Sequence, residues 1–165
     1  MLYIKLVWMY LTAVCTATFV YPFLHELGHL LAAIFTGSRI VELSVFPASY
    51  VKMDVGNVRP GKTVVVGLCG MIFPMLCAMV HPRQLTMSVI IYTIRAVNIL
   101  AWFLSCTSIV FNHIGLSWEN EDVINVIRCL GGGENVLFLV CLIAMLLSFF
   151  ALFKDKPVSR IVSFF

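Results

Sequence analysis

Two histidines, spaced four residues apart with a glutamate beside the first, occur early in this 165-residue chain as His25-Glu26-Leu27-Gly28-His29. In an α-helix, residues i and i+4 share a face, so both imidazoles can bind the same zinc ion from one side. A carboxylate at Glu26 can take a proton from water whose acidity zinc has raised, and the hydroxide formed can attack a peptide carbonyl. The pattern therefore predicts a metal centre suited to hydrolysis rather than ordinary polar residues at a helix end.

A catalytic zinc needs three protein ligands and one open position, so a third ligand must come from elsewhere in the chain. The acidic cluster Glu119-Asn120-Glu121-Asp122 is the best source. We predict Asp122 as the ligand, because it opens a short helix that can lean back toward the other helices, with Asn120 as its N-cap. Glu121, Glu119 and His113 are the rival ligands. Asp122 could instead be an ordinary carboxylate in the first turn of a helix, where the helix dipole stabilises a negative charge.

The composition is that of an integral membrane protein with several spans. Apolar residues make up 61% of the chain, charged residues 12%, and the mean hydropathy is +1.01. We expect a single membrane-embedded domain over residues 1–165 in contact with the lipid bilayer. The net charge of +3 comes without a basic stripe, which argues against nucleic acid as a partner. The scattered cysteines show no metal-ligand or disulfide spacing and are expected to pack as small apolar residues.

Four apolar runs predict an all-α fold with about four transmembrane helices, or five if the first run is divided. The runs cover residues 2–36, 63–80, 86–111 and 135–153. The first is longer than a bilayer needs, so we expect either one long helix bent at Pro22 or a span followed by a shorter helix. With one crossing before the first loop, the ends of the first and third spans lie on the same side. The histidine motif and the acidic cluster can therefore meet.

Residues 39–55 alternate apolar and polar side chains and predict a short β-hairpin after the first span. Two interpretations remain open. The hairpin could simply connect two helices, or its edge could pair with an extended substrate segment.

Small and polar residues inside the next two spans suggest how the helices pack. Gly67, Gly70 and Pro74 lie in the second span, where small residues let another helix approach closely. Arg95 and Asn98 share a face of the third span that should point into the bundle or a watery cavity rather than at lipid. They could pair with a carboxylate near the site or form an internal hydrogen-bonded pair that fixes helix packing.

The layout resembles the site-2 protease family of intramembrane zinc metalloproteases. The resemblance is carried by the histidine motif at the end of a membrane helix, by the β-like segment after it, and by Gly67-Leu68-Cys69-Gly70 followed by Pro74. It implies that His25 and His29 bind zinc, that Glu26 is the catalytic base, and that an aspartate from a later membrane helix is the third ligand.

From the motif and the resemblance together we expect a zinc metalloendopeptidase that cleaves within or next to a transmembrane segment of another protein. Water must reach such a centre, so a polar cavity is expected near residues 119–122. The chain carries no separate recognition domain, so an accessory membrane protein could help it. The alternatives are an inactive relative that acts as a membrane binding or chaperone-like protein, and a small metal-handling transporter whose ion path is lined by the same histidines and carboxylates.

Overall fold

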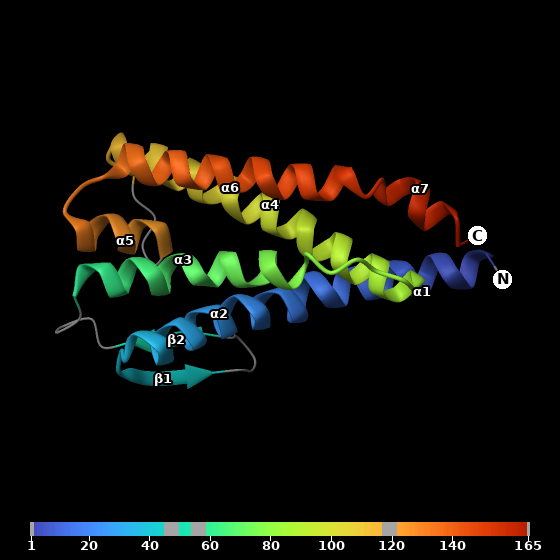
Figure 1. Cartoon of the computed structure of the whole chain (residues 1–165), viewed down its shortest axis with the longest axis horizontal. Helices are drawn as coiled ribbons and strands as arrows, with labels where there is room; N and C mark the ends of the chain where they lie inside the picture. Colours follow the sequence, from blue (N-terminus) through green and yellow to red (C-terminus); the bar gives the residue numbers. More distant parts are fainter. Residues whose placement is uncertain (1, 45–49, 54–58, 117–121, 165) are drawn as a thin grey trace.

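The structure, a computed structural model, is mostly α-helical and describes residues 2–44, 50–53, 59–116 and 122–164. Four helices in these ranges are long and apolar enough to cross a membrane: Leu2–Thr36, Pro60–Cys77, Leu85–His113 and Glu134–Val162. They lie roughly along one direction, with both chain ends at the same end of the bundle (Figure 1). The expected all-α polytopic fold is confirmed.

The first span is one continuous helix with a wide turn in its middle. It consists of α1 (Leu2–Cys15), the π-helical turn η1 (Thr16–Val20) and α2 (Tyr21–Thr36). Pro22 is the second residue of α2, just after the wide turn, and proline has no N–H to donate to the preceding turn of a regular helix. Gly37 ends α2 in the left-handed conformation at φ 64°. Of the two predicted forms, the single long helix is therefore the one found.

The predicted hairpin is confirmed after α2. Strands β1 (Ile40–Ser44) and β2 (Tyr50–Met53) pair antiparallel, with an irregularity between Ile40 and Glu42. The hairpin lies beside α2 at the end of the bundle away from the chain termini (Figure 1). Residues 45–49 and 54–55 of the predicted hairpin lie outside the described residues.

Helix α3 (Pro60–Cys77) packs along α2, and α4 (Leu85–His113) packs along α6 (Glu134–Lys154). The boundaries differ from the predicted spans by a few residues. A Cβ on Gly28 would lie only 2.8 Å from Cβ of Phe73, and it would also overlap the carbonyl of Cys69. Glycine in α2 is thus what lets α3 approach, and this fixes the distance between the two helices that frame the histidine motif.

A short helix, α5 (Asp122–Leu130), docks onto α3 through an apolar face. Its buried residues are Val123, Ile124, Val126 and Ile127. They join a core that includes Trp102, whose side chain is almost fully enclosed. A Cβ on Gly67 would lie 2.6 Å from Cγ2 of Val126, so the glycine makes room for this docking. The helix predicted to open at Asp122 is therefore present, while its predicted N-cap Asn120 lies outside the described residues.

Arg95 and Asn98 face the interior of the bundle, as predicted, and their role is to join helices. The Arg95 guanidinium donates to the carbonyls of Ala78 and Ala151, both at 2.9 Å, and to the Asp155 carboxylate at 2.7 Å. Asn98 pairs with the Tyr21 hydroxyl at 3.0 Å. The partner of Arg95 thus lies at the end of the bundle that carries the chain termini. There the basic tail forms an additional short helix, α7 (Pro157–Val162), which the sequence pattern did not indicate.

Candidate metal centre

Helix α2 places His25 and His29 on one face, as their spacing predicts. Their Nε2 atoms lie 3.1 Å apart, and the two rings meet edge to face with centroids 4.7 Å apart. The ring nitrogens of both side chains therefore converge on one point beside α3.

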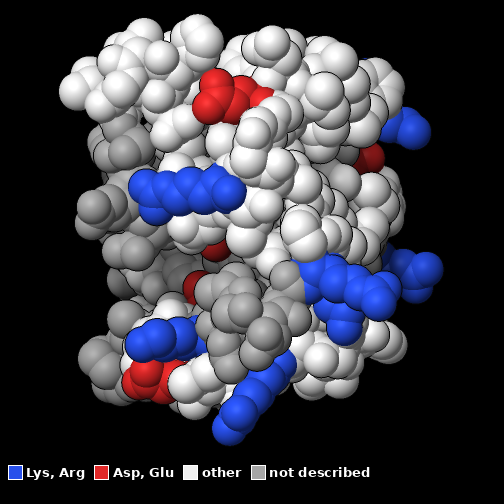
Figure 2. Space-filling view, turned by 90° about the vertical axis from the view of Figure 1, so that its left-hand side faces the viewer, with Lys and Arg blue, Asp and Glu red and all other residues white. Residues whose placement is uncertain are grey.

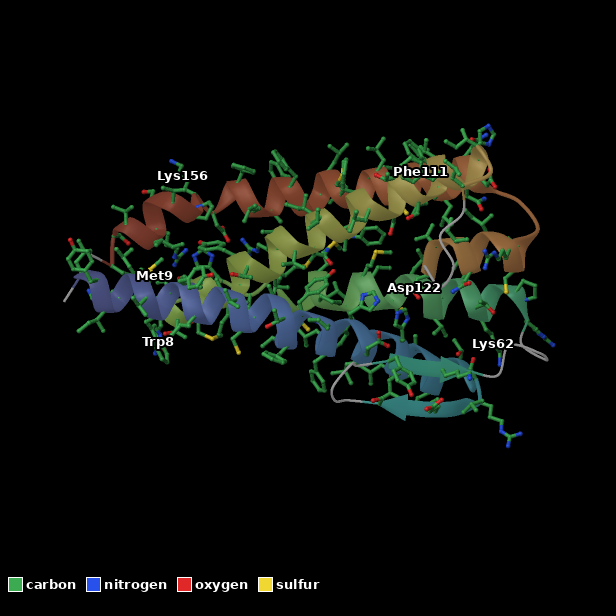
Figure 3. The ribbon with its side chains drawn as sticks, turned by 180° about the vertical axis from the view of Figure 1, so that it is seen from behind. Trp8, Met9, Lys62, Phe111, Asp122 and Lys156 are labelled. Atoms are coloured by element: carbon green, nitrogen blue, oxygen red, sulfur yellow. The ribbon has the colours of Figure 1, made fainter. Side chains whose placement is uncertain are left out.

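Asp122 supplies the third converging atom from the first turn of α5. Its Oδ2 lies 3.1 Å from Nε2 of His25 and 3.1 Å from Nε2 of His29. Figure 3 shows Asp122 where α5 meets the α2–α3 pair. Within the described ranges, these three residues are the one group of three His, Cys, Asp or Glu side chains close enough together to hold a metal ion.

The other predicted third ligands do not join the two histidines in the part of the chain that the structure describes. His113 is largely exposed and its Nδ1 lies 3.3 Å from Oε2 of Glu134, outside the cluster. Glu119 and Glu121 lie outside the described residues. Of the candidates whose position the structure gives, Asp122 is the one that joins the histidines.

The three atoms fit a tetrahedral zinc site in number, chemistry and spacing. Zinc binds imidazole nitrogen and carboxylate oxygen at about 2.0–2.2 Å, so neighbouring ligand atoms in a tetrahedron stand about 3.3 Å apart. The observed separations are all 3.1 Å. Three protein ligands leave a fourth position open, which is the arrangement of catalytic rather than structural zinc.

The contact of His29 with the Val66 carbonyl sets which ring nitrogen faces the cluster. Its Nδ1 lies 2.8 Å from the backbone carbonyl of Val66, which can only accept, so Nδ1 carries the hydrogen. In the neutral ring, Nε2 then presents a lone pair toward the nitrogen of His25 and the carboxylate of Asp122. Electron-rich atoms at this separation repel one another unless a proton or a metal ion lies between them.

The negative charge of Asp122 suits this residue to bind a cation. Burial alone would raise the pKa of its carboxyl, but the hydrogen bonds and the charges of His25 and His29 together hold the pKa well below its usual range. Asp122 is therefore an anion at neutral pH, as a carboxylate ligand must be.

Helix α3 makes room for the imidazoles by having a glycine opposite them. A Cβ on Gly70 would lie 2.5 Å from Cε1 of His29 and 2.9 Å from Cε1 of His25, and it would overlap Nε2 of His29. The close packing predicted for Gly67 and Gly70 is confirmed, with distinct reasons at the two positions. Gly67 accommodates α5, and Gly70 accommodates the histidine rings.

Glu26 is half-buried beside the cluster without being one of its three members. It follows His25 in the helix, about 100° further around the axis. Its negative charge is close enough to act on His29. A carboxylate in this position stands next to the two histidines and is not one of the three converging groups.

The cluster becomes more exposed from α2 toward α5. The side chain of His29 is 7% exposed, that of His25 21% and that of Asp122 32%. Figure 2 looks onto this end of the bundle, where basic side chains lie across the face and some acidic atoms are recessed between them. The cavity predicted near residues 119–122 falls largely outside the described residues. Among the three converging side chains, Asp122 is the most exposed.

Two contributors to the site were not found from the sequence. The Val66 carbonyl orients His29, and a backbone carbonyl has no side-chain signature. The Tyr21 ring lies against His25, with centroids 6.4 Å apart and planes inclined by 30°. The one signal for this contact in the sequence was the position of Tyr21, about one helical turn before His25.

Comparison of the chain with family models, curated proteins and solved structures gave no match. The resemblance to the site-2 protease family accordingly stays a prediction carried by the motif and the layout.

Proposed function

We propose that this chain is an integral membrane zinc metalloendopeptidase of the site-2 protease type, which cleaves peptide bonds in or near transmembrane segments of other proteins. The observation that carries the proposal is the convergence of His25, His29 and Asp122 within a bundle whose helices can cross a membrane. Acidic residues that cluster on a surface only because they are soluble would not need two histidines and packed helices around them.

Zinc, when bound, polarises a carbonyl oxygen and lowers the pKa of water. His25, His29 and Asp122 would hold it, with His29 fixed in orientation by Val66. Glu26 stands beside these ligands, where it accepts the proton of the attacking water and later returns a proton to the leaving amine. General base catalysis of this kind contributes roughly 10²–10⁴-fold to a rate.

The substrate must present an extended segment, because a peptide carbonyl within a helix is shielded by its own hydrogen bonds. The β1–β2 hairpin lies against α2, and each strand has one edge that no other described strand occupies. An extended segment can add to such an edge through main-chain hydrogen bonds. This supports the substrate-pairing interpretation of the hairpin.

The test is to measure zinc content and cleavage of a model transmembrane peptide for the wild type and for Glu26→Gln. The variant should keep about one zinc per chain and lose cleavage by at least about 100-fold. Glu134→Gln is the matched control, because Glu134 pairs with His113 outside the cluster, and it should behave as the wild type.

Each of the other outcomes refutes the proposal or supports a different function. A wild type without zinc, or a Glu26→Gln variant that cleaves normally, refutes the proposal. A wild type that holds zinc tightly but cleaves nothing, with Glu26→Gln indistinguishable from it, indicates a binding protein. Zinc that exchanges within seconds with a chelator indicates a metal-handling transporter.

A further inference from the structure

A second feature lies between the metal centre and the end of the bundle that carries the chain termini. An apolar cavity of about 170 Å³ opens there between the end of α3, α4 and the last turns of α6. Its walls are Met75, Ala78, Met79, Leu147 and Ala151, with Arg95, Asn98 and Ser148 adding polar groups. Apolar cavities of about 150 Å³ bind molecules the size of benzene, so this one has room for part of a hydrocarbon chain.

The cavity opens toward the side of the bundle that faces lipid. Met79 and Leu147 line it and are 61% and 56% exposed. Arg95 closes it on the inside, and its charge is already matched by Asp155 at 2.7 Å. The space is therefore suited to an uncharged chain entering from the bilayer.

The depth of the cavity matches the upper part of a lipid acyl chain. Helix α6 has 21 residues, about 32 Å at 1.5 Å per residue, close to the thickness of a bilayer's hydrocarbon core. If Glu134, the first residue of α6, marks one boundary of the hydrocarbon core, Lys154, the last residue of this helix, marks the other. Ala151 and Leu147 precede it by three and seven residues, placing the cavity about 5–10 Å below that boundary. Residues 147, 151 and 154 also share one face of the helix.

The polar boundary above the cavity is strongly basic. Arg83, Lys154 and Lys156 are exposed there, and Lys5 and Arg160 lie at the same end. Figure 3 shows Lys156 at this end, with Asp122 and Lys62 toward the other. Among the described residues, Asp155 is the one side-chain carboxylate at this end, and Arg95 binds it. The surface therefore complements an anionic group, and basic residues at a membrane boundary attract anionic lipid headgroups.

From the cavity, its depth and the charges above it, we propose that this end of the protein is a binding site for an anionic phospholipid. One acyl chain enters the cavity between α3 and α6, and the phosphate lies beside Lys154. The site shares no residue with the metal centre, so it holds whether or not the protein is a protease.

The test is to titrate the detergent-purified protein with phosphatidylglycerol or with phosphatidylcholine of the same chains, and to count bound lipids by mass spectrometry of the intact complex. We expect one phosphatidylglycerol to bind at least about fivefold more tightly than phosphatidylcholine, the preference that one lysine near the headgroup provides. Glycerol phosphate, which carries the charge without chains, should compete poorly.

Two variants test the headgroup contact and the acyl-chain cavity separately. Lys154→Glu should remove the preference for phosphatidylglycerol, and Ala151→Phe, which fills the cavity, should weaken both lipids. Their controls are Lys52→Glu in the hairpin and Leu146→Phe on the exposed face of α6, which should bind as the wild type does. Gel filtration and the thermal unfolding midpoint establish that each variant is folded.

Equal affinity for the two lipids, normal binding by either test variant in its folded form, or full competition by glycerol phosphate would each overturn the proposal. Loss of binding in Lys52→Glu to the same degree as in Lys154→Glu would also overturn it, because the attraction would then be general rather than local. If the Ala151→Phe variant does not fold, Ala151→Leu fills part of the same space and takes its place, with the same expectation.

Discussion

Adding a single methyl group to Gly70 tests whether the spacing between α3 and the histidine rings controls the metal centre. In Gly70→Ala the new Cβ would lie 2.5 Å from Cε1 of His29, whereas ordinary contact begins at 3.4 Å. The ring or the helix must therefore move by about 0.9 Å. The ring cannot move away without cost, because its Nδ1, the atom next to Cε1, is hydrogen-bonded to the Val66 carbonyl one turn before Gly70 on the same helix.

Displacements of this size have known consequences. A misplacement of about 1 Å in a catalytic group can cost about 100-fold in rate, and overpacking of a well-filled interior costs about 1–3 kcal/mol. We expect Gly70→Ala to weaken zinc binding by about 10–100-fold, to lower cleavage by about 100-fold, and to leave the fold intact.

The control is Gly61→Ala, on the same helix. Nothing lies within 4 Å of the Cβ that it would gain, so zinc binding should not change, and the thermal unfolding midpoint should stay the same or rise slightly. Zinc affinity is measured by competition with a chelator of known strength, and cleavage with the model peptide. A folded Gly70→Ala protein with wild-type zinc affinity would show that the contact between α3 and the imidazoles does not determine the site.

Further predictions concern the third ligand, pH and the buried ion pair. Asp122→Asn should weaken zinc binding by more than about 100-fold, whereas His113→Ala should not change it, as chelator competition will show; equal effects would remove Asp122 from the site. Zinc binding should fall as the pH is lowered from 8 to 5, because protons compete for the imidazoles while Asp122, with its depressed pKa, stays charged. A pH-independent affinity measured by equilibrium dialysis would contradict this. Arg95→Met should lower the free energy of unfolding by about 1–3 kcal/mol, since the carbonyls of Ala78 and Ala151 lose their donor and the part-buried Asp155 loses its nearest cation, and adding Asp155→Asn should restore part of the loss in denaturant titrations.

Much of this arrangement follows from local sequence patterns. The apolar runs are long enough to locate the spans, and the four-residue spacing of His25 and His29 needs nothing beyond helical geometry to bring their rings together. Counting crossings was sufficient to place Asp122 on the side of the histidines, because each span reverses the direction of the chain. These predictions depend on length and periodicity, which a single sequence displays directly.

Other parts depend on contacts between distant residues and could not be predicted. The Val66 carbonyl holds His29 through the backbone, which leaves no trace in residue type. Gly67 and Gly70 indicated close packing, but only the folded arrangement shows that one makes room for α5 and the other for imidazoles. The approach of Asp122 to the two histidines likewise depends on the rotation of a nine-residue helix about its axis.

The wide turn η1 has a mechanical consequence for the first span. No residue of α1 is buried, whereas α2 has five buried residues and is locked against α3. Bilayers differ in thickness, and a helix longer than the hydrocarbon layer adapts by tilting. A π-turn has weaker hydrogen-bond geometry than the α-helix on either side of it, so bending concentrates there. The outer half of the helix can follow changes in lipid thickness while the half that carries the imidazoles stays at rest, so the geometry of the His25–His29–Asp122 cluster is insulated from the mechanics of the surrounding membrane.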